Sequence, residues 1–335
     1  MKKIFLVGSP FCGSTVVGNI LNSHPHIFHA GEVDRLRIFS RYHGADAYLN
    51  VDGCTLCGLH HGLECPVWDN LPAAPQTPEE AVAVYETLIA RGGKQVCVDG
   101  SKNVDWLASL HDHGLQDACA IVLSRNPFAF ARSHHKAVFD PYWRGVEIWR
   151  NIYNHCLRAL LHRAIPFIVI SHSMMLENPD EFFSMILKFA GLRGGVDCHR
   201  YFEVEAHAVG GNVGAFLSYS QFNKAKYFER EAQQNRPADE EELTEKSMQS
   251  ASPFERSDSA WMEALSLADI DAGLSIPGVA DVMSLLGYSP AALVAAKIEW
   301  DLAKQKADVP PPAVSLRYPG HHAAQNAVLE QVVVV

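Results

Sequence analysis

The sequence predicts an α/β fold of three layers, in which a central parallel sheet is flanked by helices. Two observations predict this class. Between residues 4 and 190, short apolar runs typical of buried strands alternate with segments of helical periodicity. The chain has 335 residues and 48% hydrophobic content, which is enough for one substantial core.

The elements follow in chain order from these patterns. The expected strands are 4–7, 95–98, 120–124 and 166–170. The expected helices are 16–21, 77–91, 104–113, 127–138, 146–163, 179–190, 261–286 and 291–304. Thr77 and Pro78 mark a helix start, because threonine is an N-cap residue and proline suits the first turn. We expect a main domain over 1–290, with a loop-rich insert at 24–75 and a polar, lid-like segment at 215–258, followed by a C-terminal helix and tail over 291–335.

The loop of residues 8–15 (GSPFCGST), between the first strand and the first helix, predicts a P-loop-like phosphate cradle. Glycine lets the backbone approach an anion closely, and the N–H groups of a helix N-terminus favour a phosphate. A P-loop of nucleoside triphosphatases needs a lysine where this chain has Ser14. The loop should therefore hold a phosphate group whose nucleotide is not cleaved between the β- and γ-phosphates. Its expected ligands are Phe11, Cys12, Gly13, Ser14 and Thr15.

A second phosphate-binding pattern follows the strand 120–124. Arg125 supplies a planar fork for phosphate oxygens, and Pro127 suits the first turn of a helix that carries Ser133. The loop P-x-x-G-S-T and this R-N-P-x5-S pattern together resemble the sulfotransferases that use 3′-phosphoadenosine 5′-phosphosulfate (PAPS), of the bacterial type related to tyrosylprotein and carbohydrate sulfotransferases. The resemblance implies that the loop holds the 5′-phosphosulfate. It also implies that Arg125 and Ser133 hold the 3′-phosphate and that adenosine 3′,5′-bisphosphate (PAP) is the product.

Further segments, in the family's order, extend the resemblance over about residues 1–215, with a weaker continuation to 288. They are 24–25 (HP), 30–32 (AGE), 98–102 (VDGSK), 176–179 (LENP), 189–192 (FAGL), 207–212 (HAVGGN) and 285–288 (LLGY). The resemblance implies that Glu32 is the catalytic base and that Lys102 binds the phosphosulfate. A partly buried site that raises the pKa of Glu32 would suit that role.

Other roles for these residues stay open. Glu32 could be a structural partner of Arg35, and Lys102 a surface lysine at a helix start. Three histidines are alternative bases: His24, His29 and His134.

The chain departs from the family at two positions. Relatives often carry lysine or arginine where this chain has Phe11. Either another cation replaces it, with Lys102 the best candidate, or the backbone of the loop does most of the work, or activity is low. They often carry an arginine after the G-G-N segment, where this chain continues with Val213. Three residues could replace that arginine: Lys224, Lys226 and Arg256.

The insert contains a cysteine-rich segment, from Cys54 through Cys57 to Cys65. With His60 and His61 it could form a tetrahedral zinc site, but a small packed insert or a labile disulfide is also consistent, and no metal ligand is assigned. The other cysteines lie mostly in apolar contexts, which fits a reducing compartment and a cytoplasmic location. The apolar run at the N-terminus is too short for a signal peptide.

The composition of the chain limits the kinds of partner that it is expected to bind. A net charge of −10 argues against broad nucleic-acid binding, and no stretch is apolar enough to span a membrane. The expected acceptor is a small molecule, a carbohydrate or a peptide. Two alternatives to a PAPS-dependent enzyme remain: a P-loop kinase or nucleotide hydrolase, for which Asp99 is the one candidate Walker-B acid, and a non-catalytic PAP-binding relative.

Overall fold

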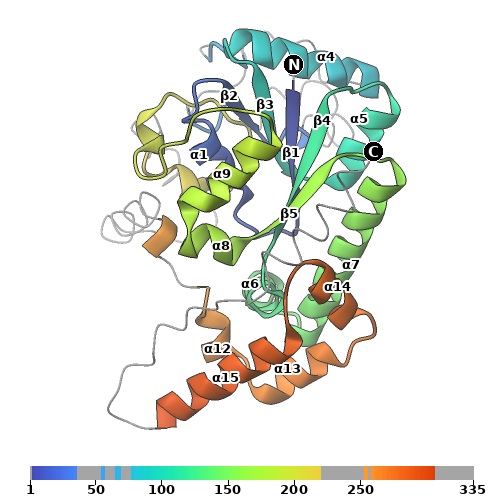
Figure 1. Ribbon diagram of the computed structural model, residues 1–335, viewed down its shortest axis with the longest axis vertical. Helices are drawn as coiled ribbons and strands as arrows, with labels where there is room; N and C mark the ends of the chain where they lie inside the picture. The colour runs from blue at the N-terminus through green and yellow to red at the C-terminus, as the bar shows by residue number, and fades with distance from the viewer. Residues whose placement is uncertain are drawn as a thin grey trace. The chain divides into compact units, whose positions relative to one another are not determined.

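The computed structural model describes residues 2–35, 54–56, 65–68, 77–219, 253–255 and 258–305. Five strands form one sheet in the order β2-β3-β1-β4-β5 (Figure 1). They are β1 (Lys2–Gly8), β2 (Ile27–Gly31), β3 (Val96–Lys102), β4 (Ala118–Ser124) and β5 (Phe167–Ser171). β1 and β2 each pair in parallel with β3. The predicted α/β fold, with a parallel sheet flanked by helices, is confirmed.

The chain falls into two compact units, which are described separately. The first comprises Met1–Val7, Gly13–Ala120 and Phe183–Glu255, and the second comprises Gly8–Cys12, Ile121–Phe182 and Arg256–Val335. The predicted boundary at residue 290 stays a prediction. The proposed lid at 215–258 and the tail after 305 lie largely outside the described residues.

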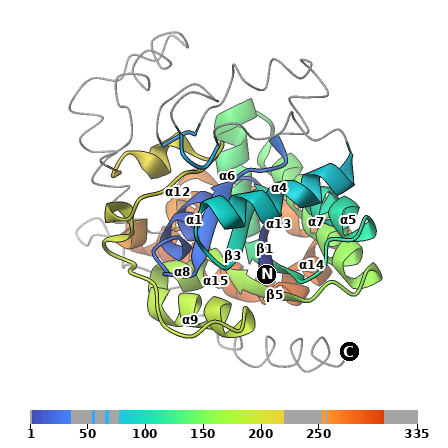
Figure 2. The same cartoon turned by 90° about the horizontal axis from the view of Figure 1, so that it is seen from above.

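In the first unit, helices pack on the strands β2 and β3 and on each other. They are α1 (Ser14–Leu21), α4 (Pro78–Arg91) and α5 (Val104–Asp112), with short 3-10 turns η1 (Tyr201–Glu203), η2 (Val213–Phe216) and η3 (Pro253–Glu255). α1 packs on β2 and β3, and α4 packs on β3 and α5 (Figure 2). Thr77 caps α4 as predicted, because its side chain accepts a hydrogen bond from the N–H of Glu80 (3.2 Å).

The second unit is built around a long helix. Its helices are α6 (Pro127–Val138), α7 (Tyr142–His162), α8 (His172–Glu177), α12 (Ala260–Ala264), α13 (Leu267–Leu274), α14 (Val279–Leu285) and α15 (Pro290–Gln305), while α9 (Pro179–Phe189) is shared with the first unit. α7 buries one face, including Val146, Trp149 and Tyr153, and packs against α6, α13 and α14. The helical periodicity of 146–163 therefore marks a true core face.

Two sequence predictions need correction. The expected loop-rich segment 24–75 begins with a strand, β2, whose apolar pattern is interrupted by His29 and is therefore hard to recognise. The single helix expected over 261–286 is three helices. Ser266 and Asp269 form a capping box that starts α13, and Gly278, with a φ of 80°, sits at the start of α14.

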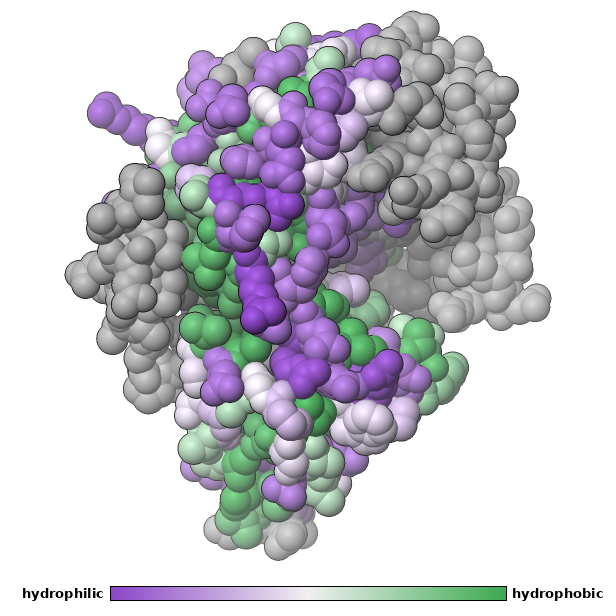
Figure 3. Space-filling model, turned by 90° about the vertical axis from the view of Figure 1, so that its right-hand side faces the viewer, coloured by the Kyte–Doolittle hydropathy of each residue, from purple (hydrophilic) through white to green (hydrophobic). Residues whose placement is uncertain are grey.

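The C-terminal helices expose several large apolar side chains. Leu267, Leu285, Ile298 and Leu302 are exposed, and Figure 3 shows apolar residues at the surface of this part of the chain. Among the described residues, no single helix has both the length and the apolar composition to cross a membrane. α14 and Pro290–Lys304 of α15 meet both conditions only as a pair, and that pair is bent by 98°.

Candidate active site

The first part of the predicted phosphate loop, Gly8–Cys12, belongs to the second unit. A Cβ atom at Gly8 would lie 2.5 Å from the carbonyl oxygen of Leu123, so only glycine fits there. The hydroxyl of Tyr153 donates to that same oxygen (2.6 Å) and accepts from the N–H of Ser9 (3.3 Å). A core tyrosine of α7 thereby holds the loop against the end of β4.

The second part of the loop starts α1 in the first unit. Gly13 occupies the N-cap position with a φ of 87°, and α1 begins at Ser14. Because a glycine cap offers no side-chain acceptor, the first N–H groups of α1 are suited to an anion. Thr15 accepts a hydrogen bond on Oγ1 from the N–H of Asn212 (3.0 Å), which links the loop to the G-G-N segment.

Arg125 and Ser133 lie together, as the sequence pattern requires. Nη1 of Arg125 donates to Oγ of Ser133 (3.1 Å) and to the carbonyl oxygen of Phe11 (3.0 Å). Nη2 and Nε both donate to Oδ1 of Asp258, at 2.7 and 3.1 Å. We call Phe11, Arg125, Ser133 and Asp258 the arginine cluster. Asp258 was not foreseen, because it is far along the chain and no motif marks it.

Other residues of the second unit hold the arginine cluster in place. The indole N–H of Trp149 donates to the carbonyl oxygen of Arg125 (2.8 Å). Asn126 caps α6, since its side chain accepts from the N–H groups of Phe128 and Ala129. These contacts fix the start of the helix on which Ser133 sits, so the guanidinium and the hydroxyl keep their relative position.

Phe11 itself offers an aromatic ring and no charge. It has a φ of 64°, is 44% exposed, and has its ring 6.2 Å from that of Phe130. The proposed replacements for the missing arginine, Lys224, Lys226 and Arg256, lie outside the described residues.

In the first unit, the carboxylate of Glu32 lies between two cations. We call Glu32, Arg35 and Lys102 the carboxylate cluster. Nζ of Lys102 donates to Oε1, and Nε of Arg35 donates to Oε2 (2.6 Å). Lys102 ends β3 and lies in register with Val7, the residue before the phosphate loop. The backbone N–H of Glu32 donates to the carbonyl oxygen of Val209 (2.7 Å). Glu32 therefore has the pairing with Arg35 that the sequence offered as an alternative, together with a contact to Lys102 that was not predicted.

The pKa of Glu32 departs from the expected direction. Burial raises its pKa, but the charges and hydrogen bonds of Lys102 and Arg35 outweigh burial, and the net result is a pKa below the ordinary value. The raised pKa that would suit a general base is therefore not found, because Lys102 and Arg35 together outweigh burial. Glu32 is consequently ionised at neutral pH and able to accept a proton.

Two of the alternative bases are buried in the first unit. Nε2 of His24 lies 2.9 Å from the carbonyl oxygen of Arg193, and its Nδ1 accepts from the N–H of His26. His29 is fully enclosed, and burial lowers its pKa to about 3, so it stays neutral. In the second unit, Nε2 of His134 is 3.0 Å from Oδ2 of Asp140.

A network of hydrogen bonds around the buried Asp99 connects β3 to the segment that bears Glu32. The sequence did not predict these contacts. Asp99 of β3 accepts hydrogen bonds from Tyr85 and from the N–H of Ser101 (2.7 Å). Oγ of Ser101 accepts from the N–H of Asp34 (3.0 Å), two residues beyond Glu32. This network ties the segment that bears Glu32 to the end of β3. Burial and the neighbouring Asp34 raise the pKa of Asp99 to about 7, despite the hydrogen bonds it accepts.

The raised pKa of Asp99 predicts a pH-dependent stability. The folded protein keeps this proton up to about pH 7, whereas the unfolded chain releases it near 3.8, so the stabilisation is complete below about pH 4 and is lost as the pH rises through about 7. The free energy of unfolding should fall by up to about 1.4 kcal/mol per pH unit in this window.

The Asp99→Asn variant should lack this slope, and urea unfolding at several pH values would measure both proteins. Equal slopes would mean that Asp99 stays ionised when folded, as the hydrogen bonds from Tyr85 and Ser101 favour.

Part of the predicted cysteine site is described. Cys54 and Cys65 are buried near each other and near His207 of the H-A-V-G-G-N segment. Cys57, His60 and His61 lie outside the described residues.

A model of the sulfotransferase family matches residues 3–194, more than half of the 335-residue chain. The chain is similar in structure to the sulfotransferase domain of the Synechococcus PCC 7002 olefin synthase, with 18% identity, a TM-score of 0.43, and coverage of 77% of this chain and 95% of that chain. It is also similar to a sulfotransferase domain of the curacin biosynthetic pathway, with 14% identity, a TM-score of 0.44, and coverage of 76% of this chain and 98% of that chain. A third similar structure is a sulfotransferase from Alicyclobacillus acidocaldarius, with 15% identity, a TM-score of 0.37, and coverage of 78% of this chain and 98% of that chain. No match to a curated protein was found. On the family match, this chain belongs to the sulfotransferase family.

Proposed function

We propose that this protein transfers the sulfuryl group of PAPS to a hydroxyl or amine of an acceptor. The observation that supports PAPS as donor is the placement of Arg125 beside Ser133, with Nη1 and Oγ 3.1 Å apart. A guanidinium and a hydroxyl that converge in this way fit the oxygens of a terminal phosphate. A 3′-phosphate is the group that distinguishes PAPS from ATP.

The phosphate loop fits the other end of the donor. Gly8 and Gly13 have backbone conformations that favour glycine, and Gly13 directly precedes the N-terminus of α1. We assign the 5′-phosphosulfate to the backbone of Phe11 through Thr15, and the 3′-phosphate to Arg125 and Ser133. Ser14 stands where a triphosphatase has lysine, which disfavours the kinase alternative.

Glu32 is proposed as the base. Its carboxylate accepts the proton of the acceptor hydroxyl as the acceptor oxygen bonds to sulfur, and the bond from sulfur to the phosphate oxygen of the donor breaks to release PAP. Lys102 stabilises the negative charge that develops on the leaving phosphate. As Lys102 turns toward that charge it withdraws from Glu32, which raises the pKa of Glu32 and strengthens the base. The acceptor is a small molecule, a carbohydrate or a peptide.

A thermal-shift experiment with PAP and with ATP–Mg²⁺, side by side, tests the donor. A ligand present at a hundred times its Kd adds roughly 2.7 kcal/mol of stability, so PAP should raise the Tm clearly while ATP–Mg²⁺ should not. Stabilisation by ATP–Mg²⁺ alone would overturn the proposal in favour of a kinase or hydrolase. Binding of PAP without turnover of PAPS, over a panel of sugar, phenol and peptide acceptors, would favour a non-catalytic PAP-binding protein.

A further inference from the structure

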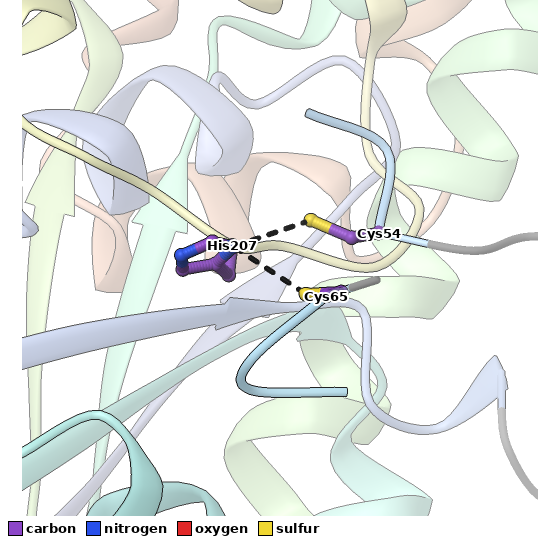
Figure 4. Close-up of side chains that lie close together, drawn as sticks. All are labelled: Cys54, Cys65 and His207. Carbon is purple, nitrogen blue, oxygen red and sulfur yellow. Dashed lines mark hydrogen bonds between the residues drawn. The ribbon is translucent and has the colours of Figure 1, made fainter. Parts of the chain in front are cut away.

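A cluster of donor atoms lies where the insert meets the H-A-V-G-G-N segment. One donor atom each of Cys54, Cys65 and His207 lies within 4.8 Å of the other two, and Figure 4 shows the three side chains converging. Nδ1 of His207 is 3.8 Å from Sγ of Cys54 and 3.4 Å from Sγ of Cys65. The residues are 1%, 2% and 8% exposed, respectively. We call them the Cys–Cys–His cluster.

The spacing matches that of ligands around one zinc ion. Zinc lies about 2.3 Å from a thiolate sulfur and about 2.0–2.1 Å from an imidazole nitrogen, so a sulfur and a nitrogen at the tetrahedral angle are about 3.6 Å apart. The two observed sulfur–nitrogen distances, 3.8 and 3.4 Å, lie on either side of this value. The donors therefore need little movement to bind a common ion.

The second nitrogen of the imidazole supports this independently. Nε2 of His207 lies 2.9 Å from Oε1 of Glu205, so Nε2 carries the proton and donates it to the carboxylate. Nδ1 is then the unprotonated ring nitrogen, and it lies toward the two sulfurs. A histidine that binds a metal typically donates its other ring N–H to a carboxylate in this way, which fixes the tautomer and makes the ligating nitrogen more basic.

We propose that Cys54, Cys65 and His207 bind one Zn²⁺ ion. Thiolate and imidazole ligands in a tetrahedral arrangement favour zinc among the common divalent ions. Both thiols lose their protons on binding, and one coordination position remains for a further donor. The histidine ligand comes from the H-A-V-G-G-N segment, instead of His60 or His61 within the insert.

Zinc at this position would fasten the insert to the segment that holds Glu32. The backbone N–H of Thr55 donates to the carbonyl oxygen of Ala208 (2.8 Å), and the N–H of Glu32 donates to that of Val209 (2.7 Å). The indole N–H of Trp68 donates to the carbonyl oxygen of His207 (3.1 Å). The ion would thus position Glu32 without touching it. This positioning role rests on the proposed function, whereas zinc binding itself does not.

Metal content and thiol state of the purified chain test the inference. The protein is prepared without chelator, its zinc is measured by plasma mass spectrometry, and its thiols are alkylated in denaturant without reductant. We expect one zinc ion per chain and alkylation of both Cys54 and Cys65. Cys54→Ser, Cys65→Ser and His207→Ala should each lose the ion. Cys119→Ser is the matched control and should keep it, because Cys119 is a buried thiol of β4.

A second measurement keeps the test valid where a ligand variant does not fold. Wild-type protein stripped by chelator is titrated with Co²⁺, whose visible and near-ultraviolet bands report tetrahedral thiolate coordination. The inference is overturned by the absence of both zinc and these bands, or by a Cys54–Cys65 disulfide in the alkylation map. PAP binding is measured on the same samples, so the zinc site and the donor assignment succeed or fail separately.

Discussion

Replacing Glu32 by glutamine should lower kcat for sulfuryl transfer by about 10²- to 10⁴-fold, the usual contribution of a general base. Glutamine keeps the size of the side chain and can still contact Lys102 and Arg35, but it accepts no proton. The Kd for PAP should change little, since the assigned phosphate ligands are other residues. Initial rates with PAPS, together with calorimetric titration of PAP, would check both expectations.

The Glu86→Gln variant is a matched control for loss of a paired carboxylate. Glu86 forms an ion pair with the largely buried Lys3, in the same unit as Glu32. Its kcat should stay close to that of the wild type. Wild-type turnover by Glu32→Gln would refute the assignment of the base, and an equal loss in both variants would point to a general effect on the fold.

The Arg125→Lys variant should bind PAP about 10- to 100-fold more weakly. Lysine keeps the positive charge, but it cannot reproduce a planar fork that contacts Ser133, Asp258 and the backbone of Phe11 at once. The loss should be specific to the 3′-phosphate. Titration with AMP, which lacks that phosphate, should therefore give nearly the same Kd for the variant and the wild type.

Arg150→Lys provides the control for this substitution. Arg150 lies in α7 of the same unit, and its guanidinium contacts the carbonyl oxygen of Pro277 (2.6 Å) and the side chain of Asn151. Its affinity for PAP should be unchanged. An Arg125→Lys variant that still prefers PAP to AMP as strongly as the wild type would place the 3′-phosphate elsewhere.

Local sequence patterns predicted much of the fold and some of the site geometry. The strands β1, β3, β4 and β5 were recognisable, because each is a short apolar run next to a turn or a helix signal. The proximity of Arg125 and Ser133 was also expected, because the family resemblance assigns both residues to one phosphate.

Contacts between distant segments could not be predicted from the sequence. The pairing of Lys102 with Glu32 depends on the strand order, in which β3 lies beside both β1 and β2. The direction of the pKa shift of Glu32 follows from that pairing and was missed for the same reason. Asp258 and His207 approach their partners from far along the chain, so no spacing rule reveals either contact.

If Arg125 holds a 3′-phosphate, as proposed, its contact with Asp258 makes phosphate binding an exchange of one anion for another. The side chain of Arg125 is only 17% exposed, and its guanidinium is already paired with the carboxylate of Asp258, whose side chain is 7% exposed. An incoming 3′-phosphate must therefore outcompete an internal anion that is held at high effective concentration. A dianionic phosphate fixed to a nucleotide can do so, whereas dilute chloride and other monoanions compete poorly. Since an ion pair is lost for each one gained, affinity should also vary less with salt than it would at a bare cation. On this proposal, Arg125 and Asp258 together select ligands by charge, because only a group that is more anionic than a single carboxylate displaces Asp258.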